Sequence, residues 1–163
     1  YMAGLKMRLM ENPVHMETFK ALGANPSPMP FGELFTAMQQ KTMDGQENPL
    51  LIIKTSKFYE VQKYLALTGH FYSPAVLMVS DKMFKGLTAD QQKALMDAAK
   101  EARDFERNFI IESEKKLVDE LKAAKMEVTT PDKALFQKAT ESVYKKFEAD
   151  IGKDLIDQVR GTK

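Results

Sequence analysis

The sequence contains no cysteine, few arginines and no long apolar run. Without cysteine the chain cannot form disulfides, use a thiolate nucleophile or bind zinc through thiolates, and such a sequence suits either the cytoplasm or the bacterial periplasm. The longest apolar runs, "PAVLMV" and "LLII", fall far short of the roughly 20 residues that span a bilayer. These absences exclude several enzyme classes and a membrane-spanning helix, but they leave the compartment open.

The charge and length of the chain restrict its function only a little. A net charge of +1 over 163 residues argues against a dedicated nucleic-acid-binding protein, and the length suits one domain. The opening stretch "YMAGLKMRLM" lacks the regions of a secretory signal, and its strand pattern begins almost at once. We therefore expect a portion of a longer protein, whose upstream half is missing.

The first third of the chain alternates short elements in an α/β rhythm. "LKMRLM" predicts a strand, and Asn12 followed by Pro13 predicts the start of a helix that ends before Gly23. Three prolines keep "ANPSPMP" extended, and the apolar spacing in residues 31–38 predicts a core-facing helix. "TMDGQENP" predicts a short strand or turn, and "YLALTGH" and "SPAVLMVS" predict two further strands.

One very long helix is predicted in the second half. Thr88 and Gln91 form a capping-box pattern, and neither proline nor glycine interrupts residues 89–125. Such a helix would be about 50 Å long, which exceeds the diameter of about 40 Å expected for a compact globule of this size. Its apolar seam changes face near Phe109 and Ile110, so the helix either serves two bodies or bends or breaks near its middle.

Two further helices are predicted at the end of the chain. Thr130 is expected to cap the first of them and Pro131 to open it, with apolar residues following along one face. "KDLIDQV" predicts a short last helix.

Arg8 is the first residue that could bind something. The chain has four arginines against twenty lysines, and Arg8 is the one that lies inside an apolar strand. A guanidinium group there needs a planar anion, which is either a protein carboxylate or a ligand carboxylate. The residues alone favour a structural salt bridge over a ligand site.

An enzyme is an alternative that the residues support weakly. His70, Glu47 and Glu11 lie near predicted strand ends, where open α/β sheets bind ligands, and they could act as a general acid and base. No nucleophile, metal cluster or phosphate-binding loop accompanies them, so we expect no metal and no cofactor. His15, in the first predicted helix, is expected to be a surface or packing residue.

Three stretches carry a resemblance to a known family. "GLKMRLM", "ALGANPSPMPFGELFTAMQQKTMDGQENPL" and "KFYEVQKYLALTGHFYSP" resemble the substrate-binding proteins of tripartite ATP-independent periplasmic (TRAP) transporters, the DctP-like family. Their order, their spacing and the long helix that follows match over nearly the whole chain. The resemblance implies an α/β, periplasmic-binding-protein-like fold with two lobes. Of this fold the chain supplies the C-terminal portion, with the long helix crossing between the lobes. It also implies a periplasmic location and no catalysis.

The resemblance also implies a binding site for an organic acid. In that site Arg8 clamps the ligand carboxylate, Phe31 packs on the ligand body and Asn48 hydrogen-bonds the same anion. Glu11, Glu47 and His70 would form the supporting polar network. Phe31 could instead be plain core, because it begins the apolar stripe of its predicted helix. Glu11 replaces an uncharged amide that relatives often carry, and its charge could repel a second ligand carboxylate or pair with a ligand hydroxyl.

The resemblance assigns the lobes, the ligand and the partners as well. Residues 1–73 and 113–163 would belong to the second lobe, and residues 74–112 to the first, mostly missing lobe. The expected ligand is a C4-dicarboxylate such as malate, succinate or fumarate, with a sialic, uronic or keto-sugar acid as the next choice. The receptor would deliver it to the membrane subunits of a TRAP transporter.

Two expectations rest on the long helix rather than on Arg8. The isolated portion is expected to self-associate through the exposed apolar residues 95–109. The remaining alternative to a receptor is a helix-rich module that binds a partner through this helix and takes no small ligand.

Overall fold

The computed structural model describes residues 2–162 and contains two small parallel sheets. In the first sheet the central strand β1 (Lys6–Leu9) pairs with β2 (Asn25–Pro28) on one side and with β3 (Gly45–Gln46) on the other. In the second, β4 (Tyr64–Ala66) pairs with β5 (Glu127–Thr129). None of the helices in residues 2–162 combines the length and the apolar composition of a membrane-spanning segment.

The first helix, α1 (Pro13–Ala21), begins and ends where the sequence predicts. The Asn12 side chain accepts hydrogen bonds from the backbone N–H groups of Val14 and His15, which satisfies two of the free donors at the helix start. Gly23 follows the helix with a φ of 89°, a conformation that favours glycine. The proline-rich stretch after it is extended as predicted, and it forms the edge strand β2.

Residues 31–60 fold into short elements. A 3-10 turn (Phe31–Glu33) leads into α2 (Leu34–Gln39), so the predicted helix is present but its first turn is tighter. The polar stretch "TMDGQENP" contains the two-residue strand β3, as expected of a short strand or turn. Helix α3 (Leu50–Thr55) and a second 3-10 turn (Phe58–Glu60) follow.

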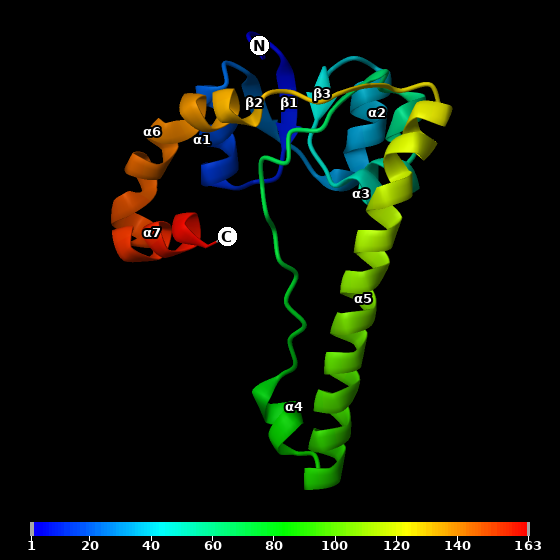
Figure 1. Ribbon diagram of the computed structural model, residues 1–163, viewed down its shortest axis with the longest axis vertical. Helices are drawn as coiled ribbons and strands as arrows, with labels where there is room; N and C mark the ends of the chain where they lie inside the picture. The colour runs from blue at the N-terminus through cyan, green and yellow to red at the C-terminus, as the bar shows by residue number, and fades with distance from the viewer. Residues whose placement is uncertain (1, 163) are drawn as a thin grey trace.

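The prediction of a strand at residues 73–80 is wrong. Residues 67–80 have no regular secondary structure, and the strand predicted just before them is limited to β4. Figure 1 shows the later part of this segment as an extended stretch that runs alone to the short helix α4 (Asp81–Lys85). A strand requires a neighbour for its backbone hydrogen bonds, and no strand of the described chain pairs with residues 73–80. Its apolar side chains are therefore exposed, including Leu77 at 78% and Met78 at 83%.

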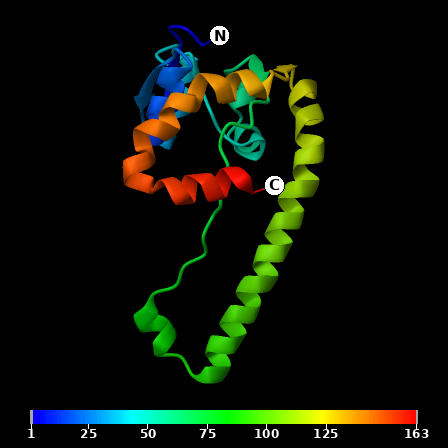
Figure 2. The same cartoon turned by 60° about the vertical axis from the view of Figure 1, so that its left-hand side comes forward.

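The long helix is continuous. Helix α5 (Ala89–Ala123) has 35 residues without a break, which confirms the prediction and makes the alternative of a broken helix wrong. Thr88 and Gln91 form the predicted capping box. At 1.5 Å per residue the helix is about 52 Å long. Figures 1 and 2 show it extending far from the sheets, with α4 at its distant end.

The last two helices follow β5, and the first of them packs against α1. Helix α6 (Lys133–Ile151) starts two residues later than predicted, because Asp132 rather than Thr130 caps it by accepting a hydrogen bond of 2.9 Å from the Ala134 N–H. Lys146 of α6 binds Glu17 of α1. Helix α7 (Lys153–Gly161) is present as predicted, and Gly152 at a φ of 94° allows the sharp change of direction before it.

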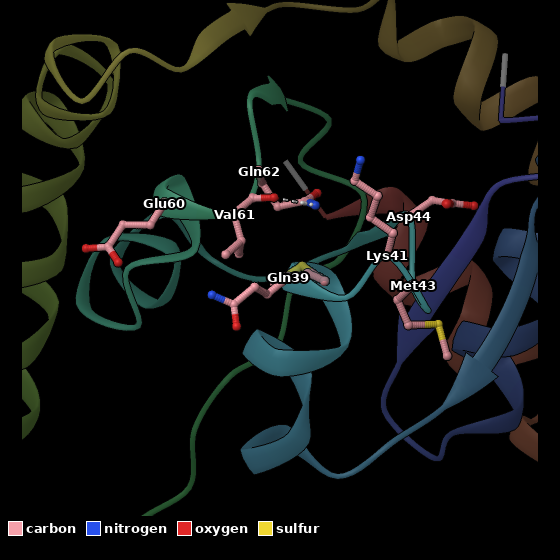
Figure 3. A pocket seen from close by; sticks show the side chains of 8 residues that line it. Gln39, Lys41, Met43, Asp44, Glu60, Val61 and Gln62 are labelled. Atoms are coloured by element: carbon pink, nitrogen blue, oxygen red, sulfur yellow. Dashed lines mark hydrogen bonds between the residues drawn. The ribbon is translucent and has the colours of Figure 1, made fainter.

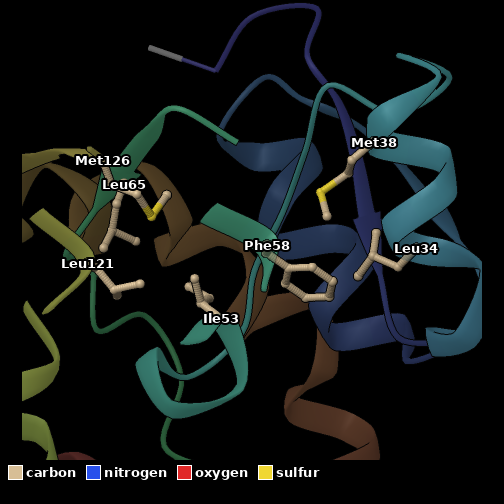
Figure 4. Close-up of a cluster of buried hydrophobic side chains, with 7 residues drawn as sticks. All are labelled: Leu34, Met38, Ile53, Phe58, Leu65, Leu121 and Met126. Atoms are coloured by element: carbon tan, nitrogen blue, oxygen red, sulfur yellow. The ribbon is translucent and has the colours of Figure 1, made fainter. Parts of the chain in front are cut away.

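Two apolar clusters hold the main body together. The larger one joins α2, α3, β4, β5 and the end of α5 (Figure 4), and its buried members are Leu34, Met38, Ile53, Phe58, Leu65, Leu121 and Met126. The smaller one joins β1 to α1 through Met7, Leu9 and Phe19. Because successive strand residues face opposite sides of a sheet, Arg8 lies on the face away from Met7 and Leu9.

Candidate functional site

Arg8 is a buried charge in the centre of the first sheet. Only 4% of its surface is exposed, and its Nε donates a hydrogen bond of 2.8 Å to the backbone carbonyl of Met29. No carboxylate of residues 2–162 lies within 4.0 Å of its guanidinium nitrogens. The structural salt bridge that the residues alone favoured is therefore absent from the described chain.

The surroundings of Arg8 make an anion favourable there. Burial lowers the pKa of Arg8, and the charge of Glu47 raises it in part, so the guanidinium lacks much of the compensation that water would supply. With Nε bound to Met29, the two terminal nitrogens are the donors that remain for a ligand. That edge of a guanidinium group matches the two oxygens of a carboxylate.

Phe31 lies beside Arg8 at the surface. The Arg8 Cζ is 5.8 Å from the centroid of the Phe31 ring, and the Phe31 ring is itself 5.8 Å from that of Phe58. Phe58 is buried in the larger apolar cluster, whereas Phe31 is 46% exposed. The buried stripe of α2 starts at Leu34, so the alternative in which Phe31 is plain core is wrong.

Asn48 is tied to the strand that neighbours Arg8. Its Nδ2 donates a hydrogen bond of 2.5 Å to Oε1 of Gln46. Gln46 is the register partner of Arg8 on β3, and register partners in a parallel sheet point to the same face. The amide of Asn48 is thus oriented by Gln46, a residue that the sequence did not single out. The role of Gln46 depends on the register between β3 and β1, and that register is known only from the folded structure.

Glu47 and His70 are brought together as expected. Oε2 of Glu47 lies 3.3 Å from Nε2 of His70, although the angle is not that of a hydrogen bond. The other ring nitrogen of His70, Nδ1, lies 2.7 Å from the hydroxyl of Thr68. Both partners are mostly buried, with 15% and 19% of their side chains exposed for Glu47 and His70.

His15 joins this group, which the sequence did not predict. Its ring stacks on Phe71 with 3.9 Å between centroids, and its Nδ1 is buried without a hydrogen-bond partner. Burial lowers the pKa of His15, while the charge of Glu47 raises it and that of His70 lowers it. The stacking of His15 on Phe71 agrees with the expectation that His15 is a packing residue. However, the ring also belongs to the electrostatic surroundings of Glu47.

Glu11 is not part of the group in this structure. It is exposed on the bend after β1 and forms no hydrogen bond or ion pair with the residues described above. Its place just past the end of β1 keeps it near that edge of the sheet.

A hollow in the described chain lies away from Arg8. It has a volume of about 430 Å³ and is lined by Met38, Gln39, Lys41, Met43, Asp44, Glu60, Val61 and Gln62 (Figure 3). Asp44 binds the backbone of Lys6, so the hollow lies toward the start of β1, whereas Arg8 and Met29 lie toward its end. Within residues 2–162 no cluster of three or more His, Asp or Glu side chains could hold a metal ion.

Comparison with known proteins assigns a family. Residues 2–150 match the profile of bacterial extracellular solute-binding proteins, family 7, also called DctP. A solute-binding protein of Verminephrobacter eiseniae is 45% identical and covers 98% of this chain and 48% of its own length. The 2,3-diketo-L-gulonate-binding periplasmic protein of Escherichia coli is 39% identical, with 96% and 49% covered.

Solved structures agree with the sequence relatives. A TRAP periplasmic solute-binding protein of Polaromonas sp. bound to D-erythronate superimposes with a TM-score of 0.93 and 43% identity, over 99% of this chain and 54% of that protein. Others in the group hold galactonate, β-D-galacturonate or succinate. The chain spans about half the length of the relatives it matches.

Proposed function

Because the chain belongs to the DctP family of bacterial extracellular solute-binding proteins, we propose that it supplies the carboxylate-binding half of a receptor for a sugar acid. The observation that carries the proposal is Arg8: a buried guanidinium without a protein carboxylate within 4.0 Å, and with its terminal nitrogens left for a ligand. A ligand carboxylate would supply the missing anion through two parallel hydrogen bonds.

The family membership confirms several of the expectations from the sequence. The fold is a mixed α/β portion of a DctP-type periplasmic binding protein with a long helix, and its relatives are periplasmic. The family binds solutes and is not enzymatic, so the acid–base alternative built on Glu11, Glu47 and His70 is dropped.

Sugar acids take precedence over dicarboxylates as the proposed ligand, which reverses the order expected from the sequence. Relatives at 39% to 43% identity are named for, or were solved with, 2,3-diketo-L-gulonate, D-erythronate and galactonate, and a succinate-bound relative is 35% identical. The charges of the site favour the same order. Arg8 is its one buried cation, and Glu47 already places a negative charge nearby. A second ligand carboxylate would meet that charge, whereas the hydroxyl groups of a sugar acid would not.

Phe31 and Asn48 are proposed to complete the site on this half. The exposed Phe31 ring offers an apolar face for the carbon chain of the ligand, next to the guanidinium group. Asn48 offers an oriented amide for the carboxylate or a hydroxyl group. The Glu47–His70 pair would support Arg8 from behind, because a nearby negative charge lowers the cost of the empty site.

The lobe assignment remains part of the proposal. Residues 1–73 and 113–163 are assigned to the lobe that carries Arg8, and residues 74–112 to the other lobe. The exposed apolar side chains of the second region support this, since Leu77, Phe105 and Phe109 are 78%, 72% and 51% exposed. The missing half of the receptor would cover them. Without it, this surface is expected to drive self-association of the isolated chain.

The complete receptor is proposed to hand its ligand to the membrane subunits of a TRAP transporter. Closure of the two lobes around the acid would be driven by contacts that form only in the closed state. The long helix α5 is proposed to cross between the lobes and to connect them during closure.

A thermal-shift panel on the complete receptor tests the proposal. The panel contains galactonate, galacturonate, D-erythronate and succinate, with galactitol as an uncharged control for galactonate. A ligand at a hundredfold excess over its Kd stabilises the folded state by about 2.7 kcal/mol, so a true ligand raises the Tm by several degrees. We expect a rise with at least one sugar acid and none with galactitol. Equal shifts for galactonate and galactitol would show that the carboxylate is not what the receptor recognises, and no shift with any acid would favour a partner-binding module instead.

A further inference from the structure

A pair of side-chain amides lies beside Arg8 on the β3 side of the first sheet. The strands lie in the order β2, β1, β3 (Figure 1), and Gln46 on β3 is the register partner of Arg8. Arg8 binds the carbonyl of Met29, which follows β2, so its guanidinium group is anchored on the opposite side. The half-buried side chain of Gln46 holds Asn48 through a hydrogen bond between the two amides. Gln46 and Asn48 therefore form the β3 side of the proposed carboxylate site.

Contacts one and two residues earlier fix the direction in which Gln46 points. Gly45 is the register partner of Met7, and a Cβ at Gly45 would lie only 2.8 Å from the sulfur of Met7. The Asp44 carboxylate accepts a hydrogen bond of 2.9 Å from the Lys6 N–H, and the Asp44 N–H donates to the Lys6 carbonyl. A slip of β3 by one residue would break these bonds and place a larger side chain against Met7. The observed register keeps Gln46 on the face away from Met7, where the ligand is proposed to bind.

The hydrogen bond between the two amides determines what Asn48 offers to a ligand. Oε1 of Gln46 accepts from Nδ2 of Asn48 at 2.5 Å. A carboxamide has two N–H donors and one carbonyl acceptor, so Asn48 keeps one N–H and its Oδ1. Among residues 2–162 neither of these remaining groups has a hydrogen-bond partner. The amide of Asn48 therefore presents a donor and an acceptor next to each other.

We propose that Gln46 is a positioning residue that acts through Asn48 and makes the receptor select acids with a hydroxyl group on carbon 2. The remaining N–H of Asn48 donates to the carboxylate held by Arg8, and its Oδ1 accepts from the hydroxyl group on the adjacent carbon. An acid without that hydroxyl group leaves Oδ1 without a donor, which costs binding free energy. D-erythronate and galactonate both carry the hydroxyl group. The inference rests on the proposed function and narrows its ligand class to 2-hydroxy acids.

Calorimetric titration of the complete receptor tests the selection. The ligands are D-erythronate, galactonate and the 2-deoxy analogue of each, at neutral pH. A carboxyl group has a pKa of about 4, so the two acids of each pair are fully ionised and differ only in one hydroxyl group. We expect each 2-deoxy analogue to bind about tenfold more weakly than its parent acid, because one half-buried acceptor is left unpaired.

The outcomes separate this inference from the proposed function. An analogue that binds as tightly as its parent acid overturns the selection for 2-hydroxy acids and leaves the receptor assignment standing. If none of these acids binds, the proposed sugar-acid ligands are wrong, and the inference falls with them.

Two variants show whether the selection depends on Gln46. Gln46→Glu keeps an acceptor for the N–H of Asn48, whereas Gln46→Met has a similar length and no such acceptor. The added charge of Gln46→Glu weakens both acids of a pair alike, so it cancels in the ratio of their Kd values. We expect Gln46→Glu to keep the ratio near about tenfold and Gln46→Met to reduce it to about twofold.

Gln62→Met is the matched control. Gln62 is half-buried, as Gln46 is, but it lines the hollow that lies away from Arg8, so this variant should keep the wild-type ratio. A purely structural role of Gln46 predicts a lower Tm for Gln46→Met with an unchanged ratio, and that result would contradict the proposal. If Gln46→Met fails to fold, Gln46→Lys decides, because a lysine offers only donors and should lower the ratio by binding Oδ1 of Asn48.

Discussion

Replacing Arg8 by methionine separates a ligand-binding arginine from a structural one. Methionine has a similar length and no charge, so Arg8→Met removes the guanidinium while filling most of its volume. A buried ion pair that loses one partner typically costs 3–5 kcal/mol of stability, roughly, because a charge is left unpaired. Arg8 has no carboxylate within 4.0 Å in residues 2–162, and its burial already disfavours the charge. The free energy of unfolding of the ligand-free receptor should therefore change little.

The magnitudes follow from the contacts of the side chain. Arg8→Met leaves the Met29 carbonyl without its donor, a loss of about 1 kcal/mol, and relief of the buried charge offsets a similar amount. The expected net change in unfolding free energy is within about 1 kcal/mol of zero. Binding should suffer far more, since two charge-assisted hydrogen bonds contribute at least about 3 kcal/mol, or a hundredfold in Kd.

Urea denaturation and calorimetry on the same complete receptor measure both quantities. Arg8→Lys is the matched control, because it keeps the charge and loses the planar pair of donors, and it should weaken binding by an intermediate factor. The reasoning is refuted if Arg8→Met lowers the unfolding free energy by 3 kcal/mol or more, roughly the value for a broken buried ion pair, while the Kd changes less than tenfold.

Further predictions concern the amide, the apo stability, the core and the exposed helix. Asn48→Asp should weaken acid binding more than Asn48→Ala does, because the added charge repels the ligand carboxylate, and calorimetry would reveal the reverse order if the amide does not face the ligand. The ligand-free receptor should lose stability as the pH falls below about 6.5, the pKa of an unfolded histidine, because burial lowers the pKa of His15 in the folded state and the unfolded chain then binds more protons. In His15→Phe the unfolding free energy from chemical denaturation should depend less on pH over this range, and an unchanged pH dependence would exclude His15 as the cause. Leu121→Ala, in the core at 0% exposure, should cost about 2–5 kcal/mol of unfolding free energy, whereas Leu155→Ala at 52% exposure should cost under about 0.5 kcal/mol; similar losses would contradict the burial described here. The isolated chain should self-associate in light scattering, and Phe105→Glu should reduce that association, whereas a monomeric wild-type chain would refute it.

Local sequence signals predicted those parts of the fold that depend on local chemistry. The Asn12 cap, the glycine after α1, the capping box at Thr88 and the unbroken α5 follow from hydrogen bonds and backbone preferences within a few residues. The prediction of a strand at residues 73–80 was wrong because a strand depends on residues that are distant in the sequence. Its apolar composition favours a strand, but a strand also needs a neighbour, and the described chain offers none. The cap of α6 moved to Asp132 because Thr130, Pro131 and Asp132 all suit a helix start.

The candidate site was predictable only where a single residue stood out. Arg8 is conspicuous because it lies inside an apolar strand. Glu47 and His70 were noted because they lie near predicted strand ends, but their role beside Arg8, like the role of Asn48, came from the resemblance to the family. The roles of Gln46 and His15 depend on strand register and on the packing of α1 against the loop after β4. Neither is encoded within one stretch of sequence.

A crystal structure of the complete receptor with galactonate, or with whichever sugar acid stabilises it most, tests the central claim most directly. The account predicts a carboxylate whose two oxygens accept hydrogen bonds from the terminal nitrogens of Arg8 at about 2.7–2.9 Å, with Nε still bound to Met29. It also predicts the Phe31 ring against the carbon chain of the ligand. An Arg8 guanidinium paired with a protein carboxylate, with the acid bound elsewhere, would contradict it.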